Sequence, residues 1–156
     1  MTSILTSLNR TIISGTILTL LFIAYYISAD GTIDEYFWQF IFRYIHVLAG
    51  IMWIGLLYYF NFVQIPNMPK IPDDQKPAIG KVIAPAALWY FRWAAMLTLI
   101  SGLILAHLNG YLISALQLGV ADSNSSNTAI GIGMWLAIIM WFNVWFVIWP
   151  NQKKAL

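Results

Sequence analysis

The chain has 156 residues, of which 60% are hydrophobic, only 9% are charged and none is cysteine. A soluble domain carries about 25% charged residues, so this composition is typical of an integral membrane protein whose first partner is the lipid bilayer. The net charge of +2 provides no basic surface for nucleic acid, which we exclude as a partner. The lack of cysteine excludes disulfides, thiolate metal sites and covalent c-type haem.

Four apolar segments are each long enough to cross a hydrocarbon core of about 30 Å, which takes about 20 helical residues. They cover approximately residues 11–29, 36–65, 86–108 and 128–149. The first has a basic flank like that of a signal peptide, but its apolar run is long and no small-residue cleavage site follows it, so we expect a retained helix. No internal repeat or second domain is visible. The sequence therefore predicts an all-α fold, a single four-helix transmembrane bundle over residues 1–156.

Basic residues gather at one end of these segments. Six of the eight are Arg10, Lys70, Lys76, Lys81, Lys153 and Lys154. The opposite end has no lysine or arginine and carries Asp30, Asp34, Glu35 and Asp122. The positive-inside rule then places both termini in the cytoplasm, and we expect a bacterial inner membrane. Four prolines in residues 66–77 predict a stiff, extended cytoplasmic loop, and residues 122–127 (DSNSSN) predict a turn on the other side.

The second segment is the one around which we expect the chain to be organised, because it is apolar yet carries an arginine and a histidine. At 100° per residue one stripe of it contains His46, Gly50, Trp53, Leu57 and Gln64, with Arg43 just beyond. Hydrocarbon cannot satisfy polar side chains, so this stripe must face other protein, a cofactor or water.

His46 is the candidate metal ligand of the chain. Counted from the outer flank, it lies about 18 Å along the helix, inside the outer leaflet. A neutral imidazole there can ligate a haem iron, and Arg43, one turn outward, can pair with a propionate. The alternative is a histidine bonded to a neighbouring helix, with Arg43 extending to the membrane interface.

Arg92 lies near the middle of the third segment, where an unpaired guanidinium is costly by about 2.5 kcal/mol or more. No acidic residue of this chain falls inside a helix. We therefore expect its counter-charge on a cofactor, a substrate, a lipid or another subunit. Pairing with carbonyls and with Asn61 or Asn143 is the alternative.

His107 lies fifteen residues after Arg92, close to the outer end of the same segment. A second histidine on a second helix suggests bis-histidine haem ligation with His46. The helix count places His46 several ångströms deeper than His107, a gap that helix tilt closes only in part. An interfacial position for His107 is the alternative.

Three strings resemble the membrane domain of the membrane-bound urate oxidase (urate hydroxylase) family: IHVLAGIMWIGLLYYFNFVQIP, RWAAMLTLISGLIL and MWFNVWFVIWPNQKK. The spacing of His46, Trp53 and Gly55 is more distantly similar to the four-helix protoporphyrinogen oxidase and copper-resistance membrane families. The resemblance covers roughly residues 35–154. It implies a membrane protein of a respiratory or quinone-linked redox system, with His46 at a haem b position. The family enzyme continues into further transmembrane helices and a cytochrome c domain, which these 156 residues do not contain.

Two functions follow from these observations. The first is a small redox subunit that carries haem b or binds a quinone and passes electrons within the membrane, with Trp53 and the residues above as its cofactor-binding set. The second is a non-catalytic structural or assembly subunit of a larger membrane complex. Both imply association with other membrane subunits or with further copies of the chain.

Overall fold

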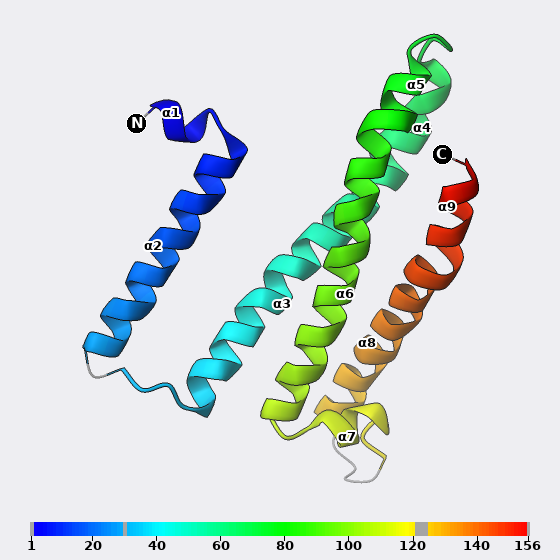
Figure 1. The fold of residues 1–156 in the computed structure, drawn as a ribbon. Helices are drawn as coiled ribbons and strands as arrows, with labels where there is room; N and C mark the ends of the chain where they lie inside the picture. The colour runs from blue at the N-terminus through cyan, green and yellow to red at the C-terminus, as the bar shows by residue number, and fades with distance from the viewer. Residues whose placement is uncertain (1, 30, 121–124, 156) are drawn as a thin grey trace. The chain divides into compact units, whose positions relative to one another are not determined.

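The computed structural model describes residues 2–29, 31–120 and 125–155, and within these ranges the chain is all-helical (Figure 1). Four helices are long and apolar enough to cross a membrane: Leu8–Ser28, Glu35–Lys70, Lys76–Leu108 and Ser125–Lys153. The predicted all-α class with four long apolar helices is therefore confirmed. Asp30, Asp122, the first part of the predicted 122–127 turn and the side chain of Lys154 lie outside the described residues.

The chain divides into two compact units, Met1–Trp38 and Gln39–Leu156. The first unit contains α1 (Thr2–Leu5) and α2 (Leu8–Ser28), and no described residue of α2 is buried. The hydroxyls of Thr11, Thr16 and Thr19 each donate to the carbonyl one turn earlier, at 2.9–3.0 Å. The polar side chains in the middle of α2 are thus satisfied by its own backbone, so they need no second helix. Asp34 then caps α3 by accepting the N–H of Phe37 at 3.0 Å.

Three long helical runs build the second unit. The first run consists of α3 (Glu35–Tyr58), η1 (Tyr59–Gln64), α4 (Ile65–Asn67) and η2 (Met68–Lys70). The second consists of α5 (Lys76–Ala78), η3 (Ile79–Ile83) and α6 (Ala84–Leu108). The third consists of α8 (Ser125–Phe142), η4 (Asn143–Ile148) and α9 (Trp149–Ala155). Lys70, Lys76, Lys81 and Lys153 mark one end of these runs, which we name the basic end. The short α7 (Leu112–Leu116) lies between α6 and α8.

The predicted extended loop over residues 66–77 is mostly helical, so that expectation is wrong. Pro66 and Pro69 stand in the first turn of short helical segments, where no amide donor is needed. The wide π-helical turns of η1 and η4 end two residues before Pro66 and Pro150. A wider turn relieves the clash between a proline ring and the carbonyl one turn earlier, so the helices continue through these prolines.

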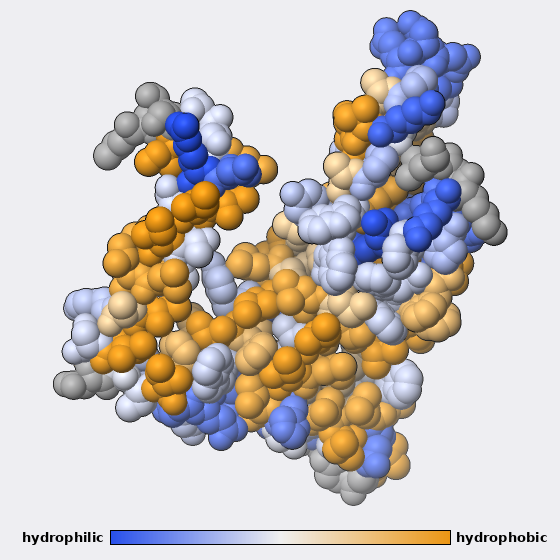
Figure 2. All heavy atoms as spheres, viewed as in Figure 1, coloured by the Kyte–Doolittle hydropathy of each residue, from blue (hydrophilic) through white to orange (hydrophobic). Residues whose placement is uncertain are grey.

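α6 is the central helix of the second unit. Most of its buried residues are spaced three or four positions apart; they are Ala84, Leu88, Phe91, Ala94, Ala95, Thr98, Ser101 and Ala106. Towards the basic end, Trp53 of α3, Val144 of η4 and Phe91, Ala94 and Ala95 of α6 form a hydrophobic core. Small alanines on α6 allow the large rings of both neighbours to approach its backbone closely. The outer faces remain apolar, and Figure 2 shows hydrophobic residues along the helices and hydrophilic ones near their ends.

Backbone caps and close contacts attach α7 to the end of α6 and to α8. Gly110 has a φ of 74°, and its N–H and that of Tyr111 donate to the carbonyls of His107 and Ala106, which closes α6 with a Schellman motif. On the other side, the indole of Trp135 donates to the Leu116 carbonyl at 3.0 Å. Gly131 of α8 lies so close to the Ala115 carbonyl that a Cβ there would overlap it.

Candidate functional site

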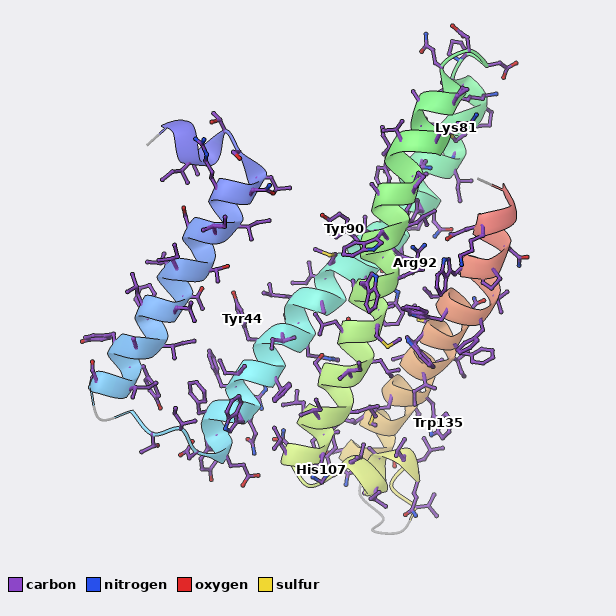
Figure 3. All side chains as sticks on the ribbon, in the orientation of Figure 1. Tyr44, Lys81, Tyr90, Arg92, His107 and Trp135 are labelled. Carbon is purple, nitrogen blue, oxygen red and sulfur yellow. The ribbon has the colours of Figure 1, made fainter. Side chains whose placement is uncertain are left out.

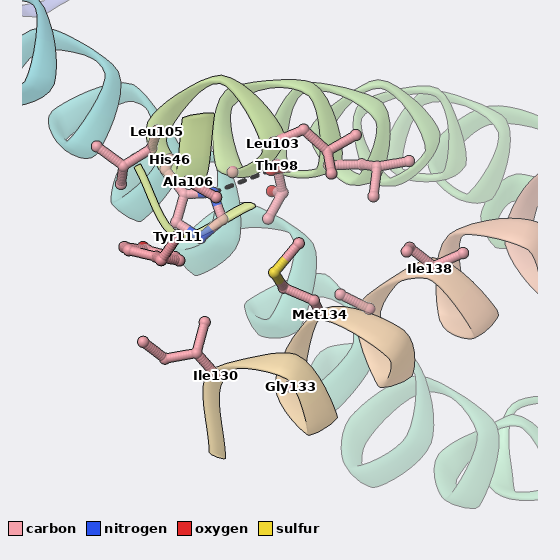
Figure 4. Close-up of a pocket in the computed structure, with 13 residues that line it drawn as sticks. His46, Thr98, Leu103, Leu105, Ala106, Tyr111, Ile130, Gly133, Met134 and Ile138 are labelled. Carbon is pink, nitrogen blue, oxygen red and sulfur yellow. Dashed lines mark hydrogen bonds between the residues drawn. The ribbon is translucent and has the colours of Figure 1, made fainter. Parts of the chain in front are cut away.

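A cavity of about 230 Å³ lies between α3, α6 and α8, at the end opposite the basic end (Figure 4). α3 contributes His46 and α6 contributes residues from Thr98 to Ala106. Tyr111 follows the α6 cap, and α8 contributes residues from Ile130 to Ile138. Most of these side chains are aliphatic, and His46, Thr98 and Tyr111 are the polar residues of the lining. This combination of an apolar wall and few polar groups is typical of a small-molecule site.

The hydrogen bonds of His46 determine which ring nitrogen is available. Its Nδ1 lies 2.9 Å from the backbone carbonyl oxygen of Thr98. A carbonyl only accepts, so Nδ1 carries the proton and Nε2 of the neutral ring keeps its lone pair. None of the described residues forms a hydrogen bond with Nε2. His46 therefore offers one oriented basic nitrogen beside the cavity, the arrangement that proteins use for a histidine ligand or proton acceptor.

Residues of α6 hold the imidazole in this position. A Cβ on Gly102 would lie 2.8 Å from Cε1 of His46, so only glycine leaves room for the ring. The hydroxyls of Thr98 and Ser101 donate within α6, to the carbonyls of Ala94 and Leu97, at 2.8 and 2.6 Å. Ser101 Oγ also lies 3.3 Å from His46 Nδ1. The polar face of α6 thus provides a hydrogen-bond acceptor to the imidazole, while the hydroxyls of Thr98 and Ser101 are themselves hydrogen-bonded.

The turn at the end of α6 brings Tyr111 to the cavity. The left-handed conformation of Gly110 reverses the chain directly after the helix, so the next residue returns over the last turn of α6. On the opposite wall Ile130 and Gly133 of α8 are exposed, and nothing lies within 4 Å of a Cβ built on Gly133. The α8 side of the cavity therefore reaches the outer, apolar surface of the unit.

Of the five residues predicted to bind a cofactor, His46 alone lines this cavity. Trp53 is 3% exposed and belongs to the hydrophobic core towards the basic end. Arg43 and His107 are exposed, His107 at the end of α6 (Figure 3). Arg92 contacts the ring of Trp149, with its Cζ 5.1 Å from the ring centroid. The structure separates these residues into different parts of the second unit.

Thr98, Gly102, Tyr111 and Gly133 line the cavity and were not among the predicted site residues. A glycine inside an apolar helix, four residues after a threonine, is a visible sign of close approach by a partner group. The sequence does not say which group approaches, because that depends on how α3 and α6 are aligned along their axes.

Haem b stays a prediction for this site. A histidine with its Nδ1–H bonded to a carbonyl is suited to axial ligation. The cavity, however, is smaller than the roughly 300–1,000 Å³ of sites for drug-sized ligands, and a porphyrin needs more room than that lower bound. A single six-membered ring fits this volume.

Comparison with family models, curated proteins and solved structures finds no match for this chain.

Proposed function

We propose that this chain is a small integral membrane redox subunit that binds the ring of a quinone or quinol beside His46. The observation that carries the proposal is the Nε2 of His46, which has no partner among the described residues and lies beside an apolar cavity of about 230 Å³. A quinol ring matches this site because it is flat and apolar, and its hydroxyl can donate to the imidazole nitrogen. The opening on the α8 side leaves a path for a lipid-like tail.

Membrane insertion is part of the proposal. Four helices have the required length and hydropathy, and large apolar side chains are exposed along all of them. With the basic end in the cytoplasm and both termini there, the His46 cavity lies in the outer half of a bacterial inner membrane. A quinone dissolved in the bilayer would reach the cavity laterally, past Gly133 and Ile130.

The chain itself contributes binding and proton handling. Nε2 of His46 accepts the hydrogen bond of a quinol hydroxyl and can hold its proton, while the aliphatic lining excludes water. Oxidation of a quinol releases two protons and two electrons: His46 holds one proton, the second leaves to water at the outer membrane surface, and both electrons pass to a metal or haem centre of a partner subunit, in keeping with the proposed role as one component of a larger complex. The resemblance of residues 35–154 to the membrane domain of membrane-bound urate oxidase supports a quinone-linked redox system.

The test is equilibrium binding of decylubiquinol to the purified chain in detergent micelles. Gly133→Leu places a side chain in the cavity, and we expect it to weaken binding at least tenfold. Gly55→Leu is the matched control, because Gly55 is also an exposed helical glycine with nothing within 4 Å, and it does not line the cavity. His46→Ala should weaken binding by roughly three- to tenfold, the loss of one hydrogen bond.

An absorption spectrum of the same sample separates the two cofactors. A Soret band that His46→Ala removes would assign haem b to the site in place of a quinone. A colourless protein that binds no quinol would contradict both redox assignments, and a structural or assembly subunit would then be the better interpretation.

A further inference from the structure

Two cations share one tryptophan ring near the basic end. The Arg92 guanidinium carbon lies 5.1 Å from the centroid of the Trp149 ring, and the Lys153 Nζ lies 4.3 Å from the same centroid. Figure 3 shows Arg92 extending from α6 towards the C-terminal helical run. Each contact is a favourable cation–π interaction, but together they place two positive charges around a single side chain.

Among the described residues of the second unit, no acidic side chain lies near enough to neutralise this pair. Residues 39–120 contain two acids, Asp73 and Asp74, and residues 125–155 contain none. Asp73 is bound to Lys76 at 2.6 Å. Sixteen helical residues separate Lys76 from Arg92, an axial distance of about 24 Å. An external anion would therefore remove the repulsion between the two cations at this ring.

The arginine side chain reaches towards the end of the helices. Trp93, the next residue, packs against Trp145 with ring centroids 5.6 Å apart. Arg92 instead contacts Trp149, one helical turn closer to Lys153 and the chain end. The guanidinium thus lies about one turn nearer the basic end than its own Cα, which is the direction of snorkelling to a membrane–water boundary.

We propose that Arg92, Lys153 and Trp149 bind the phosphate of an anionic phospholipid in the cytoplasmic leaflet. The guanidinium and ammonium supply charge-assisted donors to phosphate oxygens, and the indole marks the headgroup level. Phe146 and Val147, about one turn deeper on η4, are 58% and 46% exposed and offer an apolar surface for the acyl chains. This inference rests on the membrane insertion proposed above and is independent of the quinone site.

Native mass spectrometry of the full chain tests the assignment. Micelles contain equal amounts of phosphatidylglycerol and phosphatidylcholine with identical acyl chains, and the ratio of the two lipids retained on the protein is measured. We expect wild type to favour phosphatidylglycerol, and Arg92→Gln and Lys153→Gln each to reduce the preference roughly fivefold. Arg92→Lys should retain part of it, because an ammonium lacks the guanidinium fork.

Lys81→Gln is the matched control. Lys81 is an exposed lysine of the basic end that does not contact Trp149. Lys81→Gln removes the same charge as Lys153→Gln, and its preference for phosphatidylglycerol should equal that of wild type. Lys153 is exposed, and its replacement reports on the site even if Arg92→Gln disturbs folding. His46→Ala should leave lipid retention unchanged, which separates this result from the quinol test.

Three outcomes would overturn the lipid assignment. If Lys81→Gln loses as much preference for phosphatidylglycerol as Arg92→Gln and Lys153→Gln do, the preference arises from general surface charge and not from a specific site. Displacement of phosphatidylglycerol by inorganic phosphate at the lipid's own concentration would assign a free anion. Equal retention of both lipids by wild type would leave a partner subunit's carboxylate as the counter-charge of Arg92.

Discussion

The proposed role of His46 depends on one glycine and one carbonyl of α6. The Thr98 carbonyl accepts the hydrogen bond of Nδ1–H and so leaves Nε2 as the basic atom, while Gly102 provides the space that the ring occupies. A small-to-large change at Gly102, which also lines the cavity, therefore acts on the site first through the histidine. Gly102 is a positioning residue of the site.

Gly102→Ala should displace the imidazole, because the new Cβ would lie 2.8 Å from Cε1 and 3.1 Å from Nδ1 of His46. With the Thr98 hydrogen bond weakened, we expect decylubiquinol binding to fall roughly tenfold while the helix content by circular dichroism is unchanged. Gly55→Ala, with open space at its Cβ, is the control and should bind as wild type does. Wild-type affinity in Gly102→Ala would show that the ring position does not matter for binding.

At the scale of elements, α7 is attached to α8 next to the cavity. Three side-chain hydrogen bonds join the α7 region to α8, from Asn127 to Ser114, from Thr128 to the Leu118 carbonyl and from Trp135 to the Leu116 carbonyl. The backbone of Gly131 completes the contact against Ala115. Because α7 directly follows Tyr111, the attachment of α7 to α8 also positions the part of the cavity wall that Tyr111 forms.

Gly131→Ala and Gly133→Ala form a pair with opposite expected effects on stability. At Gly131 the new Cβ would overlap the Ala115 carbonyl oxygen, a backbone atom that cannot move aside, so we expect a loss of about 1–3 kcal/mol. At Gly133 nothing lies within 4 Å, and replacing a helical glycine by alanine should stabilise by up to about 1 kcal/mol. Thermal unfolding in micelles measures both. Equal melting temperatures would contradict the close α7–α8 contact.

At the scale of the whole molecule, charge and hydropathy act together. In the second unit Lys70, Lys76, Lys81 and Lys153 lie at the basic end, whereas Arg43 and Arg92 lie within their helices. Apolar side chains are exposed along all four long helices. α2 has no buried residue, and large apolar side chains are exposed along it. Such a helix needs an apolar medium or a partner around it.

Reporter fusions test the orientation. A periplasmically active reporter fused after Asn109 should be active, and the same reporter fused after Leu156 should be inactive, because all lysines flanking the last two helices lie at the basic end. A cytoplasmically active reporter should give the reverse pattern. The same activity at both fusion points would contradict an odd number of crossings between them and with it the proposed topology.

The number of long apolar helices and the charge asymmetry of their ends were readable from the sequence. The functional role of His46 stays a prediction. Hydropathy, charge and helical period are local properties, and a local pattern is present whether or not the chain is folded. The same reasoning failed at residues 66–77, where proline was taken as a loop signal although wide π-helical turns and first-turn positions accommodate it.

The tertiary structure alone decided which residues share a site. In the structure α6, rather than the helix of His46, lies at the centre of the second unit. Trp53 belongs to the hydrophobic core, and Arg92 contacts the ring of Trp149. It also selected Thr98, Gly102 and Tyr111 as the neighbours of His46. These choices follow from the axial alignment and rotation of packed helices. That alignment arises from contacts between residues such as His46 and Gly102, which are more than fifty positions apart and leave no periodic signal in the chain.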